Sequence, residues 1–372
     1  MTAFLTPTAR RPRGAVKING EIIPGWVELE VENVGYYSVD TFRVTFAIKG
    51  LPPDRNLAWF SEQEDMFVEL FIGFPDNPSF YTPAELQSWI YGQVDDIEDV
   101  DLANKTFSVT GRDLTRVFVD TKTTQKWPNQ TASQIATALA KKHGLTPSVT
   151  KTTAKVGKFY QIDHVQMAKS QSEWDILTYL ADSEGFNVWV RGQTLYFQPA
   201  PDPGKIAPYD LIYQQSPVGG VPSANFERMK FKRALTVSRG IQVQIRSWNK
   251  RQGKGFTVTY PSNVKTIKVG QSSVGAGAQI YSKRIPNLTQ DQALQHAQNW
   301  YRQLIAHELI MDGTMPGDNS LDTTSIIRVS GTGTAFDQLY YPDSISRTLS
   351  VEDGYDMTIS AKSHAPDSEI ML

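Results

Sequence analysis

The sequence predicts a β-rich α+β protein with several domains, and three observations support this prediction. Stretches toward both ends of the chain alternate apolar and polar residues with a period near two, which is typical of strands. Only a few segments show helical spacing, and two of them lie between the β-rich stretches. The chain has 372 residues, 40% hydrophobic and 20% charged, so it can bury a sizeable core and form two or three domains.

Residues 15–120 are predicted to form one antiparallel β-barrel or sandwich. Apolar residues alternate along 15–50, and Asn19-Gly20 is a strong signal for a two-residue hairpin turn. The segment Pro75–Ser88 contains three prolines and is predicted to be a surface excursion. Further strand-like runs are Met66–Phe74, Trp89–Val94 and Thr106–Thr110.

The middle of the chain is predicted to be a helix followed by a β-hairpin. Ser170 and Glu173 have the spacing of a capping box at the helix start, and Gly185 can take the left-handed conformation that ends a helix. The runs Phe186–Arg191 and Thr194–Gln198 then alternate like two strands. This unit is too small to bury its own apolar face, so it must pack on its neighbours.

Two more helices are predicted. Thr131 can cap a short helix that ends at Gly144. A longer helix covers Thr289–Ile310, with one apolar face that we expect to pack on the second β-rich region. That face consists of Ala293, Ala297, Trp300, Tyr301 and Leu304.

The chain after Pro199 is predicted to be linker first and strands afterwards. Residues 199–208 and 214–223 are dense in proline and glycine. From Asn225 the pattern is β-rich again. The basic segment between Thr236–Trp248 and Gly255–Tyr260 is predicted to be a hairpin tip, because a strand follows it, whereas a phosphate-binding loop would lead into a helix. The last predicted strands are Ser325–Ser330, Ser344–Ser350 and Asp356–Ala361.

Composition excludes several classes of function. A net charge of −2 gives no electrostatic reason to expect binding to nucleic acid or to an anionic membrane. The absence of cysteine removes disulfides, thiolate metal sites and cysteine nucleophiles. No apolar run is long enough to span a bilayer, and the first residues lack the apolar segment of a secretory signal. We therefore expect a soluble, non-secreted protein.

Three groups of residues were weighed as metal sites. Five acidic residues lie in Asp95–Asp101, but the turn glycine of a calcium loop is missing, so a strand edge or solvated turn is predicted. His143 is placed to favour a helix dipole when charged and has no second histidine nearby. His296, His307 and Glu308 lack the spacing of a zinc-binding helix. We predict no metal ligand.

No group of residues indicates catalysis. The sequence contains no nucleophile elbow and no phosphate-binding loop, and an acid pair such as Glu62 with Glu64 is too common to indicate catalysis without geometry. We predict no catalytic residue, no cofactor-binding residue and no cofactor, and expect that the protein is not an enzyme.

The order of the elements is more informative than any single motif. A β-domain ends in Gly111-Arg112-Asp113 and is followed by two helical segments, WPNQTASQIATALAKKHGL and SEWDILTYLADSEGF, the second of which leads into a hairpin. A second β-region then contains the helix TQDQALQHAQNWYRQL, and the order ends with YPDSISRTLSVEDGYDMTISAKS. This order resembles the baseplate hub proteins of contractile phage tails, the late-control D-type family. The resemblance runs from about Ile18 to Ser363. Its best segments are Gly111–Leu145, Glu173–Phe197 and Tyr341–Ala361.

The resemblance implies a fold and a structural role. Proteins of that family are trimers with two similar tube-type antiparallel β-barrels per chain and small α+β modules between the barrels, outside the ring. Three chains then form a ring of pseudo-six-fold symmetry that joins the hexameric tail tube to the trimeric central spike. The domains implied here are 1–120 (first barrel), 121–168 (small α+β module), 169–222 (helix–hairpin module and linker) and 223–372 (second barrel with a packed helix).

The resemblance also implies partners and a location. The expected partners are two further copies of the chain, the trimeric spike protein, tail tube or tube-initiator proteins, baseplate wedge proteins and a tape measure protein in the lumen, with no specific nucleic acid and no membrane. The expected location is the tail baseplate of the virion, after assembly in the cytoplasm of the host bacterium. The family has no catalytic residues to transfer.

Two segments depart from the family pattern, and two alternatives stay open. Pro75–Ser88 resembles an insertion and Ala9–Gly14 a basic arm; either could contact a phage-specific neighbour, although ordinary surface loops are favoured. One alternative is the equivalent hub of a phage-derived contractile injection or secretion machine.

The other alternative is a carbohydrate-binding or carbohydrate-cleaving β-protein, suggested by 8 Trp, 15 Tyr and 17 Phe. It requires an aromatic strip beside a cleft or a close carboxylate pair. Packing explains the strand positions of Trp26, Trp89, Trp189 and Trp248 equally well.

Overall fold

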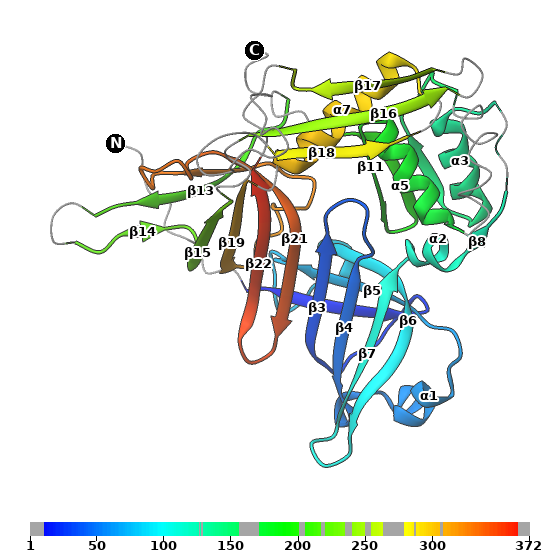
Figure 1. Ribbon diagram of the computed structural model, residues 1–372. Helices are drawn as coiled ribbons and strands as arrows, with labels where there is room; N and C mark the ends of the chain where they lie inside the picture. The colour runs from blue at the N-terminus through cyan, green and yellow to red at the C-terminus, as the bar shows by residue number, and fades with distance from the viewer. Residues whose placement is uncertain are drawn as a thin grey trace.

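The chain folds into one large β-sheet with smaller sheets and a few helices packed beside it (Figure 1). The computed structural model describes residues 11–125, 127, 129–155, 171–200, 205–216, 220–234, 240–249, 254–262, 279–285, 288–305 and 308–363. The predicted β-rich α+β fold class is confirmed. In the described part of the chain, no helix combines the length and apolar character needed to cross a membrane.

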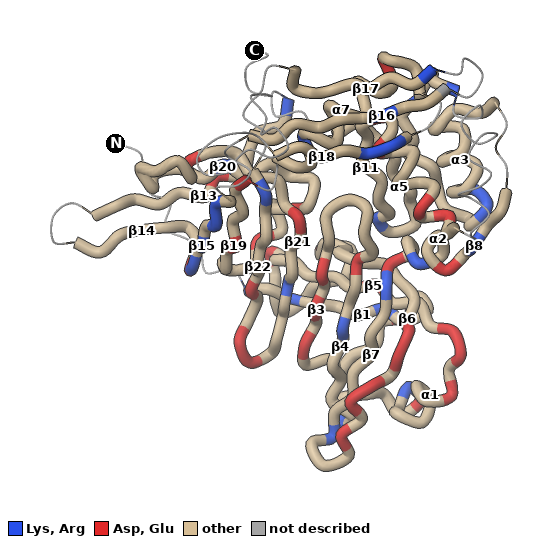
Figure 2. The backbone as a smooth tube through the Cα atoms, viewed as in Figure 1, with Lys and Arg blue, Asp and Glu red and all other residues tan. Residues whose placement is uncertain are grey.

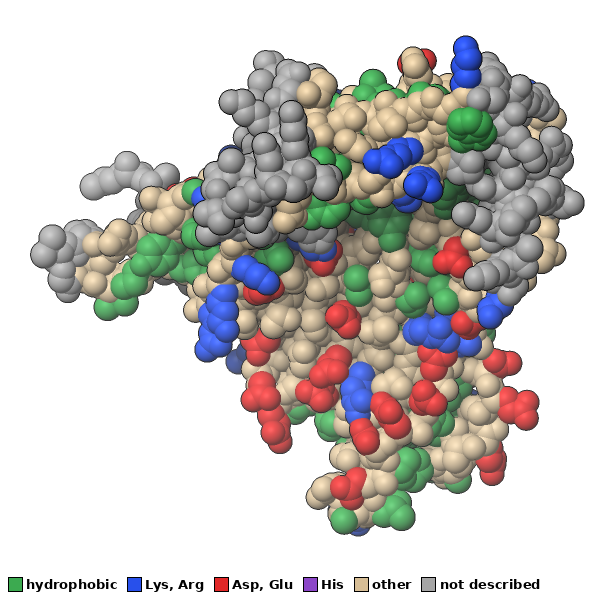
Figure 3. All heavy atoms as spheres, in the orientation of Figure 1, with side chains coloured by type: hydrophobic (Ala, Val, Ile, Leu, Met, Phe, Trp, Pro, Cys, Tyr) green, Lys and Arg blue, Asp and Glu red, His purple; other side chains and the backbone are tan. Residues whose placement is uncertain are grey.

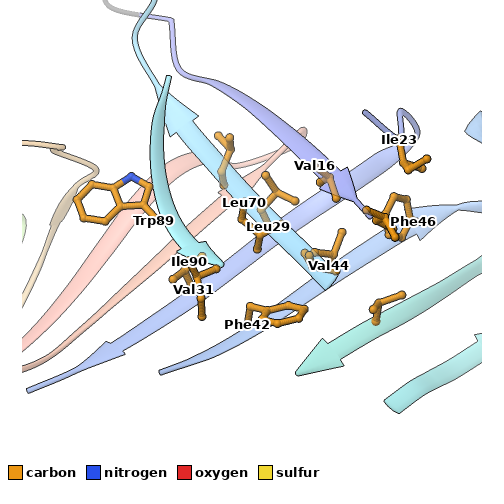
Figure 4. Packing of buried hydrophobic residues seen from close by; sticks show 14 of the residues in the cluster. Val16, Ile23, Leu29, Val31, Phe42, Val44, Phe46, Leu70, Trp89 and Ile90 are labelled. Carbon is orange, nitrogen blue, oxygen red and sulfur yellow. The ribbon is translucent and has the colours of Figure 1, made fainter. Parts of the chain in front are cut away.

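The first half of the large sheet wraps around its own hydrophobic core. Its strands are β1 (Arg13–Ile18), β2 (Glu21–Ile22), β3 (Trp26–Val34), β4 (Thr41–Ala47), β5 (Phe67–Gly73), β6 (Gln87–Asp101) and β7 (Thr106–Asp113). Alternate residues such as Leu29 and Val31 on β3 and Val44 on β4 point into this core (Figure 4). The helix α1 (Leu57–Glu62) contributes the fully buried Phe60. The short 3-10 helices are η1 (Ile48–Gly50), η2 (Pro53–Arg55) and η3 (Pro83–Glu85).

The second half of the sheet encloses a separate core. Its strands are β13 (Tyr209–Gln214), β14 (Ser223–Ala224), β15 (Arg228–Arg233), β19 (Leu309–Pro316), β20 (Ile327–Ser330), β21 (Leu339–Ser350) and β22 (Gly354–Ser363). The core includes Met311, Tyr340 and Ile359. The last three predicted strands are confirmed: β20 begins two residues later than predicted, whereas β21 and β22 extend beyond their predicted bounds.

Two expectations for this half were wrong. Tyr209–Gln214 lies between the two proline-rich segments that were predicted to be linkers, yet it pairs as β13 with β20. That pairing is parallel, so the second half is not purely antiparallel. The physical reason is the connection: β13 and β20 are separated by more than a hundred residues, and a long connection permits parallel neighbours where a tight turn does not.

The two halves form one continuous sheet because β21 pairs with β3. Seven residue pairs, from Ser344 opposite Val34 to Ser350 opposite Glu28, make this antiparallel ladder. The sequence offered no local signal for it, since the two strands are about 300 residues apart in the chain.

A small α+β module follows the first half. It contains α2 (Arg116–Asp120), β8 (Lys122–Thr123), α3 (Ala132–Lys142), β9 (Thr146–Val149), β10 (Gln171–Ser172), α5 (Glu173–Glu184), β11 (Phe186–Arg191) and β12 (Thr194–Pro199). Its core is formed by the apolar faces of α3 and α5 and by the hairpin β11–β12. Thr131 caps α3 and Gly185, at φ 69°, ends α5, both as predicted.

The start of α5 differs from the prediction. Its capping box is formed by Ser172 and Asp175, and Ser170 lies outside the described residues. The chain stays extended up to Ser172 because Gln171 and Ser172 pair with β8, so the helix begins at Glu173.

A second α+β module consists of β16 (Ile241–Asn249), β17 (Lys254–Tyr260), β18 (Gln279–Arg284) and α7 (Gln290–Ile305). The predicted hairpin β16–β17 is confirmed up to the pair Asn249 and Lys254, and its tip at 250–253 lies outside the described residues. The helix α7 packs on β16 and β17, not on the second half of the large sheet. Its predicted end at Ile310 was wrong because Leu309 and Ile310 pair in the β19 ladders.

The two segments that depart from the family pattern contact each other. Arg13 Nε donates to the carbonyl of Pro78 (2.8 Å), and Tyr81 Oη donates to the carbonyl of Gly14 (3.1 Å). Tyr81 also packs against a small cluster of Ala15, Phe71 and Leu86. The insertion is therefore anchored on β1, while Ala9 and Arg10 lie outside the described residues.

Candidate functional site: a polar sheet face and the buried junction behind it

The most extensive functional feature is the solvent side of eight consecutive strands of the large sheet. These strands lie in the order β15-β19-β22-β21-β3-β4-β7-β6, and all seven pairings between them are antiparallel. We call this side the polar face. It crosses the join between the two halves without interruption (Figure 1).

Strand parity sets which side chains form the polar face. On β3, the odd-numbered Leu29 and Val31 are fully buried, so the even-numbered Glu28, Glu30 and Glu32 point to the other side. The register aligns one cross-strand row of polar side chains over eight strands. This row is Arg228, Thr314, Thr358, Ser346, Glu32, Thr41, Arg112 and Gln93.

The charges on the polar face are not evenly spread. Basic side chains gather at β15, and acidic side chains gather on β3 and over β6 (Figures 2 and 3). On the acidic side, Arg43 bonds Glu98 at 2.6 Å and also bonds Asp99, while Arg112 bonds Asp95 at 2.6 Å. The pKa of Asp95 is lowered, mainly because its carboxylate accepts hydrogen bonds from Arg112. These carboxylates are held in surface ion pairs.

A buried polar junction lies behind the polar face, where the two halves meet. Arg347 on β21 is fully buried and stacks over the Trp89 ring, with its guanidinium carbon 3.5 Å from the ring centroid. Its Nη1 donates to Asn33 Oδ1 (2.8 Å) and its Nη2 to the carbonyl of Leu321 (2.6 Å). Arg347 thus bonds both halves at once. Burial lowers the pKa of Arg347 to about 10.

Two carboxyl groups extend this junction on the first half. Asn33 Nδ2 donates to Asp40 Oδ2 (2.8 Å), and the Val34 amide donates to Asp40 Oδ1 (2.8 Å). Burial raises the pKa of Asp40 to about 6. Burial, with the nearby charge of Asp40, also raises the pKa of Asp113, whose carboxylate accepts from the Thr115 hydroxyl at 2.7 Å.

The first α+β module is tied to the same region. Arg191, at the end of β11, bonds Asp322 at 2.7 Å, one residue after the carbonyl that Arg347 contacts. Trp189 on the same strand packs edge-on against Tyr36 (5.1 Å between centroids), and Trp174 Nε1 donates to the carbonyl of Tyr37 (3.2 Å). The junction therefore connects the first half of the large sheet, its second half and the first α+β module.

The residues considered as metal ligands are explained by other contacts. Asp95–Asp101 lies entirely on β6, so the strand edge is the one of the two predicted alternatives that the structure shows. His143 Nε2 lies 2.5 Å from Glu173 Oε2, and Lys142 bonds the other oxygen of this fully buried carboxylate. This contact links the end of α3 to the start of α5. The sequence analysis missed Glu173 as its partner.

The remaining candidates do not converge either. Burial lowers the pKa of His296 on α7, Glu308 bonds Arg233 at 3.1 Å, and His307 lies outside the described residues. Among the residues that the structure describes, no group of three or more His, Cys, Asp or Glu could hold a metal ion.

The four tryptophans considered for a carbohydrate site form no common strip. Trp89 is buried at the junction, Trp189 stacks on Tyr196 in the first α+β module, and Trp248 is exposed on β16 in the second one. Trp26 packs on the core of the first half. Trp26 and Trp89 lie on the large sheet, whereas Trp189 and Trp248 lie on two other sheets, so packing explains these side chains better than one carbohydrate site.

Comparison with known proteins defines the class of fold. No known protein family and no curated protein matches the sequence. Solved structures do match over nearly the whole chain. A tail protein from Neisseria meningitidis superimposes with a TM-score of 0.68 at 14% identity, covering 95% of this chain and 97% of the other.

Two further structures show the same architecture. The 43 kDa tail protein of prophage MuSo2 from Shewanella oneidensis has a TM-score of 0.65 at 17% identity, covering 96% of this chain and 99% of the other. The Escherichia coli c3393 protein, a component of the type VI secretion system, has a TM-score of 0.52 at 10% identity, covering 94% and 77%. The chain therefore has the fold of phage tail proteins, and the resemblance found in the sequence is confirmed at the level of fold.

Proposed function

We propose that this chain is the structural baseplate hub of a contractile phage tail. One observation carries the proposal: two tail proteins share the fold over 95–96% of this chain and 97–99% of their own length. At this coverage the shared fold is not limited to one domain but includes both sheet halves and the two α+β modules.

The assembled form that we propose is a trimeric ring of pseudo-six-fold symmetry. Each chain supplies two sheet halves, each with its own core, joined side by side through β3 and β21. Three chains would then present six similar units, which can match a hexameric tail tube on one side and a trimeric spike on the other. We propose that the two halves are barrels of one type, approximately residues 1–120 and 223–372 together with β13.

The proposed partners follow from this ring. They are the trimeric central spike, tail tube or tube-initiator proteins, baseplate wedge proteins, and a tape measure protein in the lumen. The polar face is suited to line a water-filled lumen because its exposed side chains are mainly hydroxyls and charges. The proposed location is the tail baseplate of a virion that assembles in the bacterial cytoplasm.

A second candidate is the equivalent hub of a phage-derived contractile injection or secretion machine. The match to a component of a type VI secretion system favours it specifically. The mechanics would be the same in both cases, since the ring would join a tube to a spike.

The mass of the purified chain in solution tests the proposal. We expect sedimentation equilibrium to give three times the chain mass of 41.6 kDa for the protein alone, or, after addition of the spike protein, the mass of a complex that contains three copies of this chain. A protein that remains monomeric with its spike protein present, or that forms a closed dimer, contradicts the proposed hub.

A further inference from the structure

The polar face ends in two strands whose outer edges lack a ladder partner among the described residues. At one end, β15 pairs with β19 only. At the other end, β6 pairs with β5 up to Gln93, and the Val94 amide donates to the Met66 carbonyl. Beyond Val94, the β6 segment Asp95–Asp101 pairs with β7 alone. Unpaired strand edges favour pairing with another strand.

The edge at β15 is basic. Its sequence is RMKFKR, and the side chains of Arg228, Lys230 and Lys232 are exposed on the polar face. Arg233 bonds Glu308, and Asp312 lies opposite Lys230 on β19. Asp312 is the one carboxylate within the register of these three exposed cations, so the edge has a net positive charge (Figure 2).

The edge at β6 is acidic. Five carboxylates lie between Asp95 and Asp101, and three guanidinium groups, those of Arg43, Arg112 and Arg116, bond some of them. Asp96 is exposed, and the side chain of Asp99 remains 67% exposed despite its ion pair. The edge is therefore net negative.

The strand directions permit these two edges to join. Because seven antiparallel pairings separate β15 from β6, the two strands run in opposite directions. Rotation about a ring axis keeps the sense of every strand along that axis. The β6 strand of one copy would thus lie antiparallel to the β15 strand of the next copy, and the alternation of the polar face would continue across the boundary.

We propose that β15 of one copy binds along Asp95–Asp101 of β6 in the next copy. The contact is head-to-tail, and three copies related by a rotation of a third of a turn would close it into a ring. Charge selects this arrangement: two β15 edges would bring lysines together and two β6 edges would bring carboxylates together, and both pairings are repulsive. This inference rests on the proposed ring and names the surfaces that form it.

Cross-linking tests the contact directly because the chain has no cysteine of its own. In the full-length variant Lys230→Cys/Asp96→Cys, a short bifunctional maleimide should give covalent dimers and trimers and nothing larger. The variant with Lys230→Cys alone and the variant with Asp96→Cys alone should give far less product. A matched control, Lys230→Cys/Gln295→Cys, places the second thiol on the exposed side of α7 and should also fail to form the ladder.

Charge reversal tests the selectivity. Lys230→Glu/Lys232→Glu should weaken self-association roughly tenfold or more, and adding Asp96→Lys/Asp99→Lys in the same chain should restore part of it. Association of the unaltered chain should also weaken as salt increases.

The two proposals fail in different ways. The strand contact is overturned by a trimer that does not cross-link between positions 230 and 96. It is also overturned if the charge-reversal variant keeps a native circular dichroism spectrum and associates as strongly as the unaltered chain. Either result leaves the hub proposal intact. A chain that shows neither self-association nor cross-linking, with or without spike protein, overturns both.

Discussion

At the scale of single residues, Arg347 is the most informative side chain. Its strand reads Ser-Ile-Ser-Arg-Thr-Leu, and Arg347 is in phase with Ile345 and Leu349, both of which point into a core. Strand parity alone therefore indicates a buried arginine, and the sequence analysis did not use this signal. The partners Asn33 and Leu321 lie far away in the chain, and no local pattern could have identified them.

Truncating Arg347 should destabilise the fold strongly. Arg347→Ala leaves Asn33 Oδ1 and the Leu321 carbonyl without their buried donor and opens space beside Trp89. Breaking a buried charged contact typically costs about 3–5 kcal/mol. We expect a loss of this order in the free energy of unfolding, measured with denaturant. Arg328→Ala, which removes an exposed ion pair with Asp210, should have little effect. Similar losses in both variants would contradict the assignment of the junction.

The carboxyls of Asp40 and Asp113 should make stability depend on pH. The pKa of Asp40 is about 6 in the folded chain, above its ordinary value of 3.8, so the folded state binds more protons between these values. Stability should therefore be highest at the acidic end and fall by about 1–3 kcal/mol as the pH rises through 6.

Asp113→Asn provides the matched test. The amide can keep both contacts to Thr115, while the Asp113 carboxyl, whose pKa is raised by burial and by the nearby charge of Asp40, no longer titrates. Denaturant unfolding between pH 4 and pH 8 should show a smaller loss than for the unaltered chain. Asp96→Asn, at an exposed position, should keep the full loss. An unchanged slope in Asp113→Asn would show that this pair does not titrate as described.

The purified protein should show no hydrolytic activity. Asp95, Glu98 and Asp99 on β6 are engaged in ion pairs, and the four tryptophans are spread over three sheets. Incubation with peptidoglycan and common polysaccharides should release no sugar. Turnover that disappears on substitution of a single carboxylate would overturn this prediction.

At the scale of elements, local signals were reliable and distant pairings were not predictable. Three local signals are found as the sequence indicated: Thr131 caps α3, Gly185 ends α5, and Asn19-Gly20 forms a turn. Each of them depends on only a few neighbouring residues. The cap of α5 moved from Ser170 to Ser172 because pairing with β8 keeps the chain extended. The strand β13 was missed because it lies between two proline-rich segments, and its partner β20 is distant in sequence.

The candidate site shows the same division. The acidic run was visible in the sequence, where a strand edge or a solvated turn was predicted, and it lies on β6. The polar face was not, because it requires the register of eight strands from both ends of the chain. Parity predicts which residues leave the core, but only tertiary pairing aligns them in rows.

The apolar face of α7 should stabilise the second α+β module. Tyr301 packs edge-on against Tyr260 of β17, with ring centroids 5.2 Å apart. Because Tyr301 is partly buried, Tyr301→Ala should cost about 2–3 kcal/mol. Thermal unfolding should show a clearly lower midpoint for this variant. Gln295→Ala, on the exposed side of the same helix, should barely change the midpoint, and equal effects would mean that the packed face is misassigned.

At the scale of the whole molecule, the continuous sheet explains how one chain can present two similar units in a fixed arrangement. The β3–β21 ladder, Arg347 and the Arg191–Asp322 ion pair all lie at the boundary between the halves. A rigid boundary would hold the two units at a constant angle, which a closed ring requires. The two exposed strand edges at opposite ends of the polar face supply the contacts between chains in the proposed ring.

Electron microscopy of the purified protein, alone and with its spike protein, tests the central claim most directly. The account predicts ring-shaped particles with three-fold symmetry and six similar lobes around a central channel, with the two α+β modules of each chain outside the ring. Particles of another symmetry, or rings whose channel is not lined by the polar face, would contradict it.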